Sequence, residues 1–339
     1  MPDSDGGSAR SGLSSPACSD WARSQHLDPV GSAGHYQGFL LVEQPLPWPF
    51  DVSSIPELVE MAKLAVAAGL RVQTVIPVDQ EDVAAPTRGN GGDGAYGPER
   101  RPAAETLRRL ICYRSARPGW AGPLVRSERT VEPGSLADAV SEMVGQSPSV
   151  EGPGDAADVI DVLVCTHGRR DACCGSRGMD LVTELSFSPR FGAQSGVRLW
   201  RTSHTGGHRF APTSILLPSG TMWAWADVTL LRAAAFAEGD VGQGLGRYRG
   251  CATIGSPSQQ AVERAVLAEV GWELIGSWRR ASDLGHGVVR LESELGGTWE
   301  ASVREGRRVP QPDCRTAPEL AAKQSVEWVV EGLSQVVPA

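Results

Sequence analysis

The spacing of apolar positions predicts an α/β fold from the first half of the chain onward. Residues 39–42 form a short apolar run closed by prolines, which is typical of a buried strand. Residues 56–69 place apolar side chains on one helical face and end at Gly69, and residues 70–78 form a second strand. We expect this βαβ unit to be followed by a loop rich in Gly, Asp and Pro at residues 79–102, a strand at 107–114, and a helix at 135–144 that Ser135 can cap.

A second α/β unit is predicted after a Gly- and Pro-rich linker at residues 145–158. An apolar, β-branched strand at residues 159–165 ends on Cys165, and a strand at residues 197–204 ends on His204. Ligand sites in open α/β sheets gather at the carboxyl ends of strands, which makes these ends the region of interest. The remaining elements predicted here are a loop carrying Cys173 and Cys174, a short helix at 178–185, a hairpin at 213–227 around Ser219 and Gly220, and a helix at 228–239.

The last third of the chain predicts a smaller, antiparallel extension. Its pattern indicates a helix at 256–271, strands at 272–280, 287–293 and 298–305, and a final helix at 317–333. The N-terminal residues lack apolar periodicity and predict a mobile tail, in which Cys18 and Trp21 are the residues able to anchor. We therefore expect four parts, namely a tail at 1–34, an α/β lobe without metal ligands at 35–148, an α/β domain at 157–250, and a helix with a β meander packed on that domain at 251–339.

Composition narrows the class of protein. The 339 residues include 32 basic and 40 acidic side chains, and the net charge of −8 argues against nucleic acid or an anionic membrane surface as a partner. A basic redox partner protein is compatible with this charge. The absence of a long apolar run and of a leader-like N-terminus leads us to expect a cytoplasmic protein. Seven cysteines, two of them adjacent, do not resemble a disulfide framework, and clustered Cys and His in a reducing compartment indicate metal or redox chemistry.

Candidate chemistry is concentrated in residues 164–212, which hold three of the seven cysteines and three of the six histidines. Eight residues separate Cys165 from Cys174, enough for the chain to leave a strand, loop out and return. His204 and His208 are separated by a threonine and two glycines, and the glycine pair predicts a tight loop rather than a helix. Two thiolates and two neutral imidazoles suit a tetrahedral Zn²⁺ ion and equally a [2Fe–2S] cluster with mixed ligands.

The segments CTHGRRDACCG and SHTGGHRFAP resemble the sucrase/ferredoxin-like family, whose members are similar to thioredoxin-like ferredoxins. The likeness extends over most of residues 39–315 and includes EQPLPW, YRGCATIGSP and the late PQPDCRT. It implies a thioredoxin-like ferredoxin domain, preceded by the other α/β lobe and followed by the antiparallel extension. It also implies a [2Fe–2S] cluster in which one iron is bound by the two cysteines and the other by the two histidines, that is, by Cys165, Cys174, His204 and His208.

Cys173 leaves the cysteine assignment open, because it is adjacent to Cys174 and either thiol could bind the metal. Arginines near a cluster would offset its negative charge, and Asp171 would fix the surrounding loop through an Asx turn or an ion pair. The residues expected to support the site in these ways, rather than to bind metal, are His167, Arg169, Arg170, Asp171, Cys173, Gly206, Gly207 and Arg209.

Electron transfer is favoured over catalysis, because the sequence contains no recognisable acid/base pair, nucleophile elbow or phosphate loop. Imidazole ligands would raise the potential above that of an all-cysteine ferredoxin, and their second ring nitrogens would allow proton uptake to accompany the electron. Two alternatives stay open. The protein could be a structural or interaction protein stapled by zinc, or a thiol-dependent redox enzyme in which His167 lowers the pKa of Cys173 or Cys174.

Overall fold

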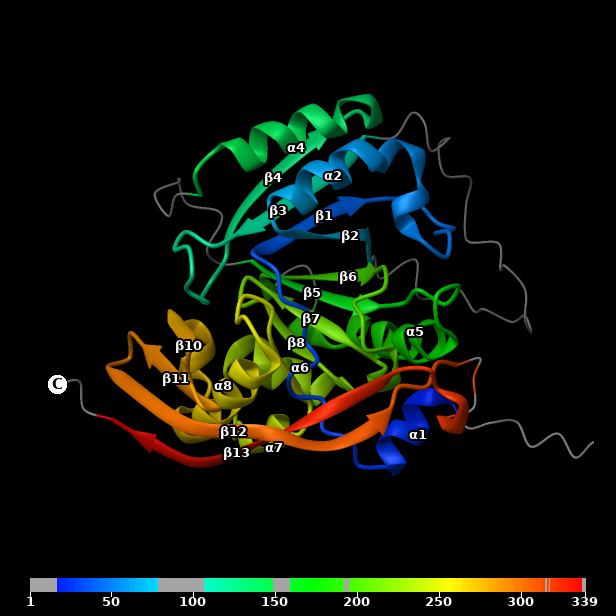
Figure 1. Cartoon of the computed structure of the whole chain (residues 1–339). Coiled ribbons are helices and arrows are strands. Elements are labelled where there is room, and N and C mark those ends of the chain that lie inside the picture. The colour runs from blue at the N-terminus through cyan, green and yellow to red at the C-terminus, as the bar shows by residue number, and fades with distance from the viewer. Residues whose placement is uncertain are drawn as a thin grey trace, which may run out of the picture.

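The computed structural model describes residues 17–78, 107–148, 159–191, 195–314, 316 and 318–336. Within these ranges the strands form two sheets, a mixed sheet of nine strands and an antiparallel sheet of four. In Figure 1 the large sheet runs through the middle of the molecule, and the strands of the small sheet form a long curved band beneath it. The predicted α/β class with an antiparallel C-terminal extension is confirmed.

The first half of the large sheet is built around β1 (Gly38–Glu43), which is buried along nearly its whole length. β1 pairs in parallel with β2 (Leu70–Pro77) and antiparallel with β3 (Arg108–Arg114). β3 in turn pairs antiparallel with β4 (Val125–Val131), which occupies the edge of the sheet. β4 is not predicted by the sequence pattern, because this edge strand is mostly polar and has no apolar run.

The second half of the sheet repeats the same arrangement. β5 (Ile160–Cys165) pairs in parallel with β6 (Val197–Thr202) and antiparallel with β7 (Ser214–Leu217). β7 pairs antiparallel with β8 (Thr221–Trp223), and β9 (Tyr248–Cys251) adds an outer strand. Strand order and directions therefore match those of the first half, and the antiparallel pairing of β2 with β6 joins the two halves.

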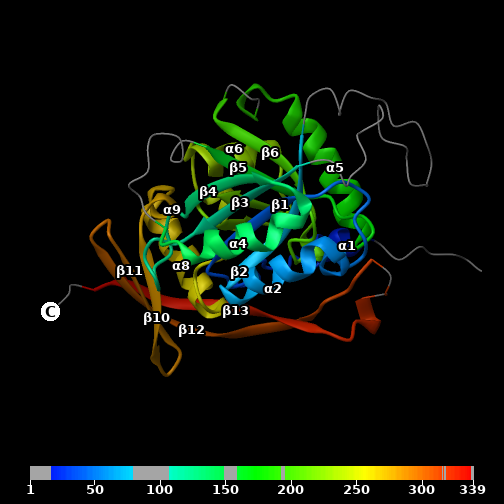
Figure 2. The same ribbon diagram turned by 90° about the horizontal axis from the view of Figure 1, so that it is seen from above.

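Helices cover the large sheet, and the small sheet packs against α8 (Pro257–Val270), which in turn contacts β9. Figure 2 shows α2 (Val59–Ala67) and α4 (Leu136–Gly145) side by side over the first half. The helices α5 (Ala172–Ser186) and α6 (Val228–Phe236) pack their apolar faces on the core of the second half. In the described part of the chain no helix is long and apolar enough to cross a membrane. The remaining elements are α1 (Cys18–Ser24), α7 (Gly242–Leu245), α9 (Glu273–Gly276), β10 (Arg279–Gly285), β11 (Val288–Ser293), β12 (Gly297–Pro310) and β13 (Gln324–Gln335).

The helix predicted at residues 178–185 begins earlier, at Ala172, so the prediction that Cys173 and Cys174 lie in a loop is wrong. Cysteine and glycine have low helix propensity, which explains the late start that the sequence pattern suggests. Asp171 overrides this tendency as the N-cap, since its side chain accepts a hydrogen bond from the Cys173 backbone N–H at 3.1 Å. Both cysteines therefore occupy the first turn of α5.

Two predictions in the last third of the chain are also wrong. Most of the helix predicted at residues 317–333 is the strand β13, which pairs antiparallel with β12, as its β-branched and aromatic residues favour. The strand predicted at residues 272–280 contains the short helix α9 in its first half. Ser135 occupies the N-cap position of α4 but makes no capping hydrogen bond through its side chain.

Residues 17–34, predicted as part of a mobile tail, are packed instead. α1 buries Cys18 and Ala22, which confirms Cys18 as an anchor. The Asp28 carboxylate forms an ion pair with Arg264 of α8 at 2.5 Å. The rest of the predicted tail, the loop predicted at 79–102 and most of the predicted linker lie outside the described residues.

Candidate metal centre

The carboxyl end of β5 and the amino end of α5 meet at the predicted site. Cys165 is the last residue of β5 and is fully buried, and Cys174 lies in the first turn of α5. The two elements touch at Gly178, where an added Cβ would lie 1.9 Å from the Cys165 carbonyl oxygen. A glycine is therefore required for the helix to approach the strand end this closely.

Cys165, Cys174 and His204 form a first group of potential ligands, and their ligand atoms all lie within 4.8 Å of one another. Both cysteines are buried and His204 is half-buried. The His204 Nδ1 is buried and has no hydrogen-bond partner among the described residues. Two sulfur atoms beside an imidazole with an unpartnered buried nitrogen form a set that can hold a soft metal ion.

The loop between the two histidines is shaped by Gly206 and Gly207, whose φ angles of 81° and 67° lie in the left-handed region. A Cβ at Gly207 would also lie 2.6 Å from the Arg249 guanidinium. Arg249 extends from β9 and is 1% exposed; it donates hydrogen bonds to the carbonyl oxygens of Gly206 at 3.1 Å and Ser32 at 2.6 Å. Arg249, which was not predicted as a site residue, thus connects the histidine loop to the N-terminal segment.

Arg249→Met is expected to lower the free energy of unfolding by about 1–3 kcal/mol, because buried carbonyl oxygens would lose their donors. Urea unfolding followed by circular dichroism measures this. Arg247→Met is the matched control, since Arg247 is one-third exposed and its ion pair with Asp227 is worth at most about 1 kcal/mol. Equal losses in the two variants would contradict the role assigned to Arg249.

His208 lies beside the first group without joining it. Its Nδ1 is 2.8 Å from Asp171 Oδ2, and its ring centroid is 5.9 Å from that of His204. The carboxylate that caps α5 thus also orients this imidazole. A carboxylate bound to one ring nitrogen is the arrangement that leaves the other nitrogen available to a metal.

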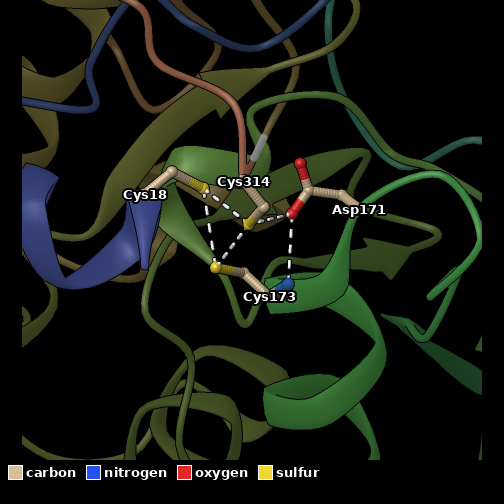
Figure 3. Close-up of side chains that lie close together, drawn as sticks. All are labelled: Cys18, Asp171, Cys173 and Cys314. Atoms are coloured by element: carbon tan, nitrogen blue, oxygen red, sulfur yellow. Dashed lines mark hydrogen bonds between the residues drawn. The ribbon is translucent and has the colours of Figure 1, made fainter. Parts of the chain in front are cut away.

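A second group of potential ligands, not predicted from the sequence, contains Cys18, Asp171, Cys173 and Cys314. Figure 3 shows the three sulfur atoms facing one another, with Asp171 beside Cys314. Cys173 Sγ lies 3.5 Å from Cys18 Sγ and 2.9 Å from Cys314 Sγ, and the last two sulfurs are 3.3 Å apart. The adjacent Cys173 and Cys174 therefore belong to different groups, and it is Cys174 that lies with Cys165.

A family model described as sucrase/ferredoxin-like matches residues 29–244, well over half of the chain. This chain belongs to the sucrase/ferredoxin-like family. The part matched by the sucrase/ferredoxin-like model contains the whole first group and His208, but neither Cys18 nor Cys314. No curated protein and no solved structure matches the chain.

Each group in this sucrase/ferredoxin-like protein contains one stabilised thiolate. The pKa of Cys165 is held well below its usual value, chiefly by a hydrogen bond from the Cys174 thiol. The pKa of Cys173 is lowered to about 3, chiefly because the thiols of Cys18 and Cys314 donate to its sulfur. The pKa values of the donors Cys174 and Cys18 are raised by the same hydrogen bonds. In each group one thiol thus has a lowered pKa, which favours the thiolate, the form in which cysteine binds metals.

His167 supports the first group through its backbone rather than its ring. Its backbone N–H bonds to the Cys165 sulfur and helps to lower the pKa of that thiol. The ring is 3% exposed; its Nε2 donates to the Pro49 carbonyl oxygen at 2.9 Å, and burial lowers the pKa of the imidazole. The thiols of Cys18 and Cys314, not the His167 ring, are the main groups that lower the pKa of Cys173.

The arginines predicted to support the site fall into two classes. Arg169 and Arg170 are exposed, and the Arg170 guanidinium stacks 4.3 Å from the Phe50 ring centroid. Arg209 is 7% exposed, and burial lowers the pKa of its guanidinium to about 10. Burial has the same effect on Arg249, whose charge interacts with both cysteines of the first group. Arg209 and Arg249 are thus the buried cations near the ligand groups.

Proposed function

We propose that this protein is a one-electron carrier that binds a [2Fe–2S] cluster through Cys165, Cys174, His204 and His208. The observation that carries this proposal is the convergence of Cys165 at the end of β5, Cys174 in the first turn of α5 and His204 just after β6, with ligand atoms within 4.8 Å of one another. Family membership supports it, because the matched segment contains all four residues. When bound, such a cluster supplies a one-electron redox couple.

The donor set fits this cofactor. The stabilised Cys165 thiolate and the neighbouring Cys174 would bind one iron. His204 has a buried Nδ1 without a hydrogen-bond partner among the described residues, as expected of a ring placed for metal binding. The Nδ1 of His208 interacts with the Asp171 carboxylate, so its Nε2 is the ring nitrogen available to bind the metal. The role of Asp171 in this scheme is to hold the His208 ring in a single orientation.

Electrons would pass on the histidine side of the site. Both cysteines of the first group are buried, whereas the His208 side chain is 24% exposed and His204 is half-buried. A redox partner protein would therefore dock against the histidine loop, and the net charge of −8 favours a basic partner. Proton uptake coupled to the electron stays a prediction.

Purification under low oxygen, followed by iron, zinc and acid-labile sulfide analysis, tests the proposal. We expect a brown protein with two irons and two sulfides per chain and, after reduction, the electron paramagnetic resonance signal of a [2Fe–2S] cluster with mixed ligands. A colourless protein without sulfide, with zinc that is lost in Cys165→Ser, would contradict it and favour a zinc staple at the first group. A metal-free protein with a reactive thiol would favour the thiol enzyme.

A further inference from the structure

We propose that Cys18, Cys173 and Cys314, with Asp171 as the fourth ligand, form a second metal site that binds a thiolate-preferring divalent ion, zinc in the first place. Their ligand atoms lie within 4.8 Å of one another, and none of the four belongs to the first group. The inference does not depend on the [2Fe–2S] proposal, because the two groups share no ligand.

The sulfur positions fit a small ion. The three Sγ to Sγ distances are 2.9, 3.3 and 3.5 Å. A disulfide needs about 2.05 Å, so none of these pairs is bonded. Zn–S bonds of about 2.3 Å in a tetrahedron place sulfur atoms about 3.7 Å apart, so the three sulfurs need to spread by less than about 1 Å.

Asp171 is placed to complete the tetrahedron. Its Oδ1 lies 2.9 Å from Cys314 Sγ and is held by the Cys173 backbone N–H at 3.1 Å. Its other oxygen is taken by His208, so a single carboxylate oxygen faces the sulfur atoms. Three thiolates and one carboxylate oxygen form a closed set of four ligands, as structural zinc sites require.

The charge around the group supports a metal-thiolate centre. Three thiolates, a carboxylate and a divalent ion sum to a charge of −2, since the remaining thiol protons are released on binding. Arg209 is 7% exposed, its Nε has no hydrogen-bond partner, and no carboxylate within the described residues forms an ion pair with it. Its charge interacts with Cys18. The guanidinium lies 4.3 Å from the Phe210 ring centroid, a contact that does not neutralise its charge. A buried cation without an anionic partner is costly, and an anionic centre beside it offsets that cost.

The site would join three distant parts of the chain. Cys18 opens α1, Cys173 lies in the first turn of α5, and Cys314 lies between β12 and β13. Sequence separations of 141 to 296 residues divide them. Metal binding at this group would hold α1 and the C-terminal segment against α5, the helix that carries Cys174 of the first group, so we assign the second site a structural role.

A metal titration tests the second site on its own. Full-length Cys165→Ser protein, which has lost a ligand of the first group, is stripped with a chelator under reducing conditions and titrated with Co²⁺ as a spectroscopic substitute for zinc. We expect one Co²⁺ per chain, with the thiolate charge-transfer band and the d–d bands of tetrahedral cobalt. Adding Cys314→Ser is expected to weaken binding by more than the 10–100-fold that loss of an outer partner costs.

Cys251→Ser in the same background is the matched control, since the Cys251 thiol is buried away from both groups and bonds to Ser219 and Thr253. It should leave binding unchanged. Cys314 is only half-buried, so its replacement is expected to preserve the far-ultraviolet circular dichroism, and Cys18→Ser provides an independent variant.

Three results would overturn the second site. The first is the absence of tetrahedral cobalt in Cys165→Ser, and the second is unchanged binding in the Cys314→Ser and Cys18→Ser variants. The third is a disulfide among the three cysteines in wild-type protein purified without oxygen, detected by mass spectrometry. Zinc in that wild-type protein that is lost in Cys314→Ser, while iron is retained, would support both sites separately.

Discussion

Cys174→Ser is expected to abolish binding of iron and acid-labile sulfide, whereas Cys173→Ser keeps both at the wild-type level. Cys174 lies with Cys165 and His204, while Cys173 lies with Cys18 and Cys314. Serine cannot replace a thiolate ligand of a [2Fe–2S] cluster without loss of affinity. Iron and sulfide analysis of the two variants, prepared in parallel under low oxygen, measures the difference.

The two variants control for each other, because each changes one sulfur to oxygen in the same turn of α5. Zinc provides a second readout, since the proposed second site would lose its ion in Cys173→Ser alone. If Cys173→Ser lost its iron while Cys174→Ser kept it, the ligand would be Cys173 and the grouping seen here would be wrong.

Gly178→Ala is expected to destabilise the fold by about 3 kcal/mol and to reduce cluster occupancy. A Cβ at this position would meet the Cys165 carbonyl oxygen at 1.9 Å, so α5 must move away from the end of β5. The sign of this change in the free energy of unfolding is informative, because replacing glycine by alanine in the middle of a helix normally stabilises the protein by up to about 1 kcal/mol. Urea unfolding gives the stability, and iron content of the folded protein gives the occupancy.

Gly145→Ala serves as the comparison, since Gly145 ends α4 and an added Cβ there would have no neighbour within 4 Å. We expect this variant to be neutral or slightly stabilised and to keep its iron. Equal stability of the Gly178→Ala and wild-type proteins would show that the contact between α5 and β5 is looser than the structure describes.

Asp171 is the residue through which the two ligand groups meet. It caps α5 through Cys173, holds the ring of His208, and has its Oδ1 2.9 Å from the Cys314 sulfur. From the sequence, Asp171 was predicted to fix its loop through an Asx turn or an ion pair. The structure gives it contacts on both sides, so the geometry of the histidine ligand and that of the three-cysteine group are linked.

Local sequence patterns were sufficient to predict the strands and the loop that position Cys165, His204 and His208. Apolar runs with β-branched residues indicated the strands that end at Cys165 and lead to His204, and parallel pairing of β5 with β6 brings their ends together. The glycine pair indicated the tight loop that separates the histidines, and both glycines adopt left-handed φ angles. These features depend on residues that are neighbours in the sequence, so they can be predicted without knowledge of the tertiary structure.

The sequence did not predict that Cys173 and Cys174 belong to different ligand groups, because the predicted start of α5 was too late in the chain. Successive residues of an α-helix point about 100° apart, so in the first turn of α5 the two thiols face different surroundings. In the loop that the sequence suggested, either thiol could have faced Cys165. The Asp171 cap fixes the residue at which α5 begins, and the packing of Gly178 on β5 fixes which face of the helix points toward Cys165.

The amino-acid sequence was enough to predict the α/β class, the family resemblance and the two segments that carry the Cys and His residues of the first group, since these are encoded in periodicity and short motifs. Only the tertiary structure showed that Cys18 and Cys314, which are 296 residues apart, lie beside each other and beside Cys173. That contact requires β13 to return along β12, where a helix was predicted, and α1 to pack against the histidine loop. Such contacts are made by pairing and burial between distant segments, and no local pattern at either cysteine carries that information.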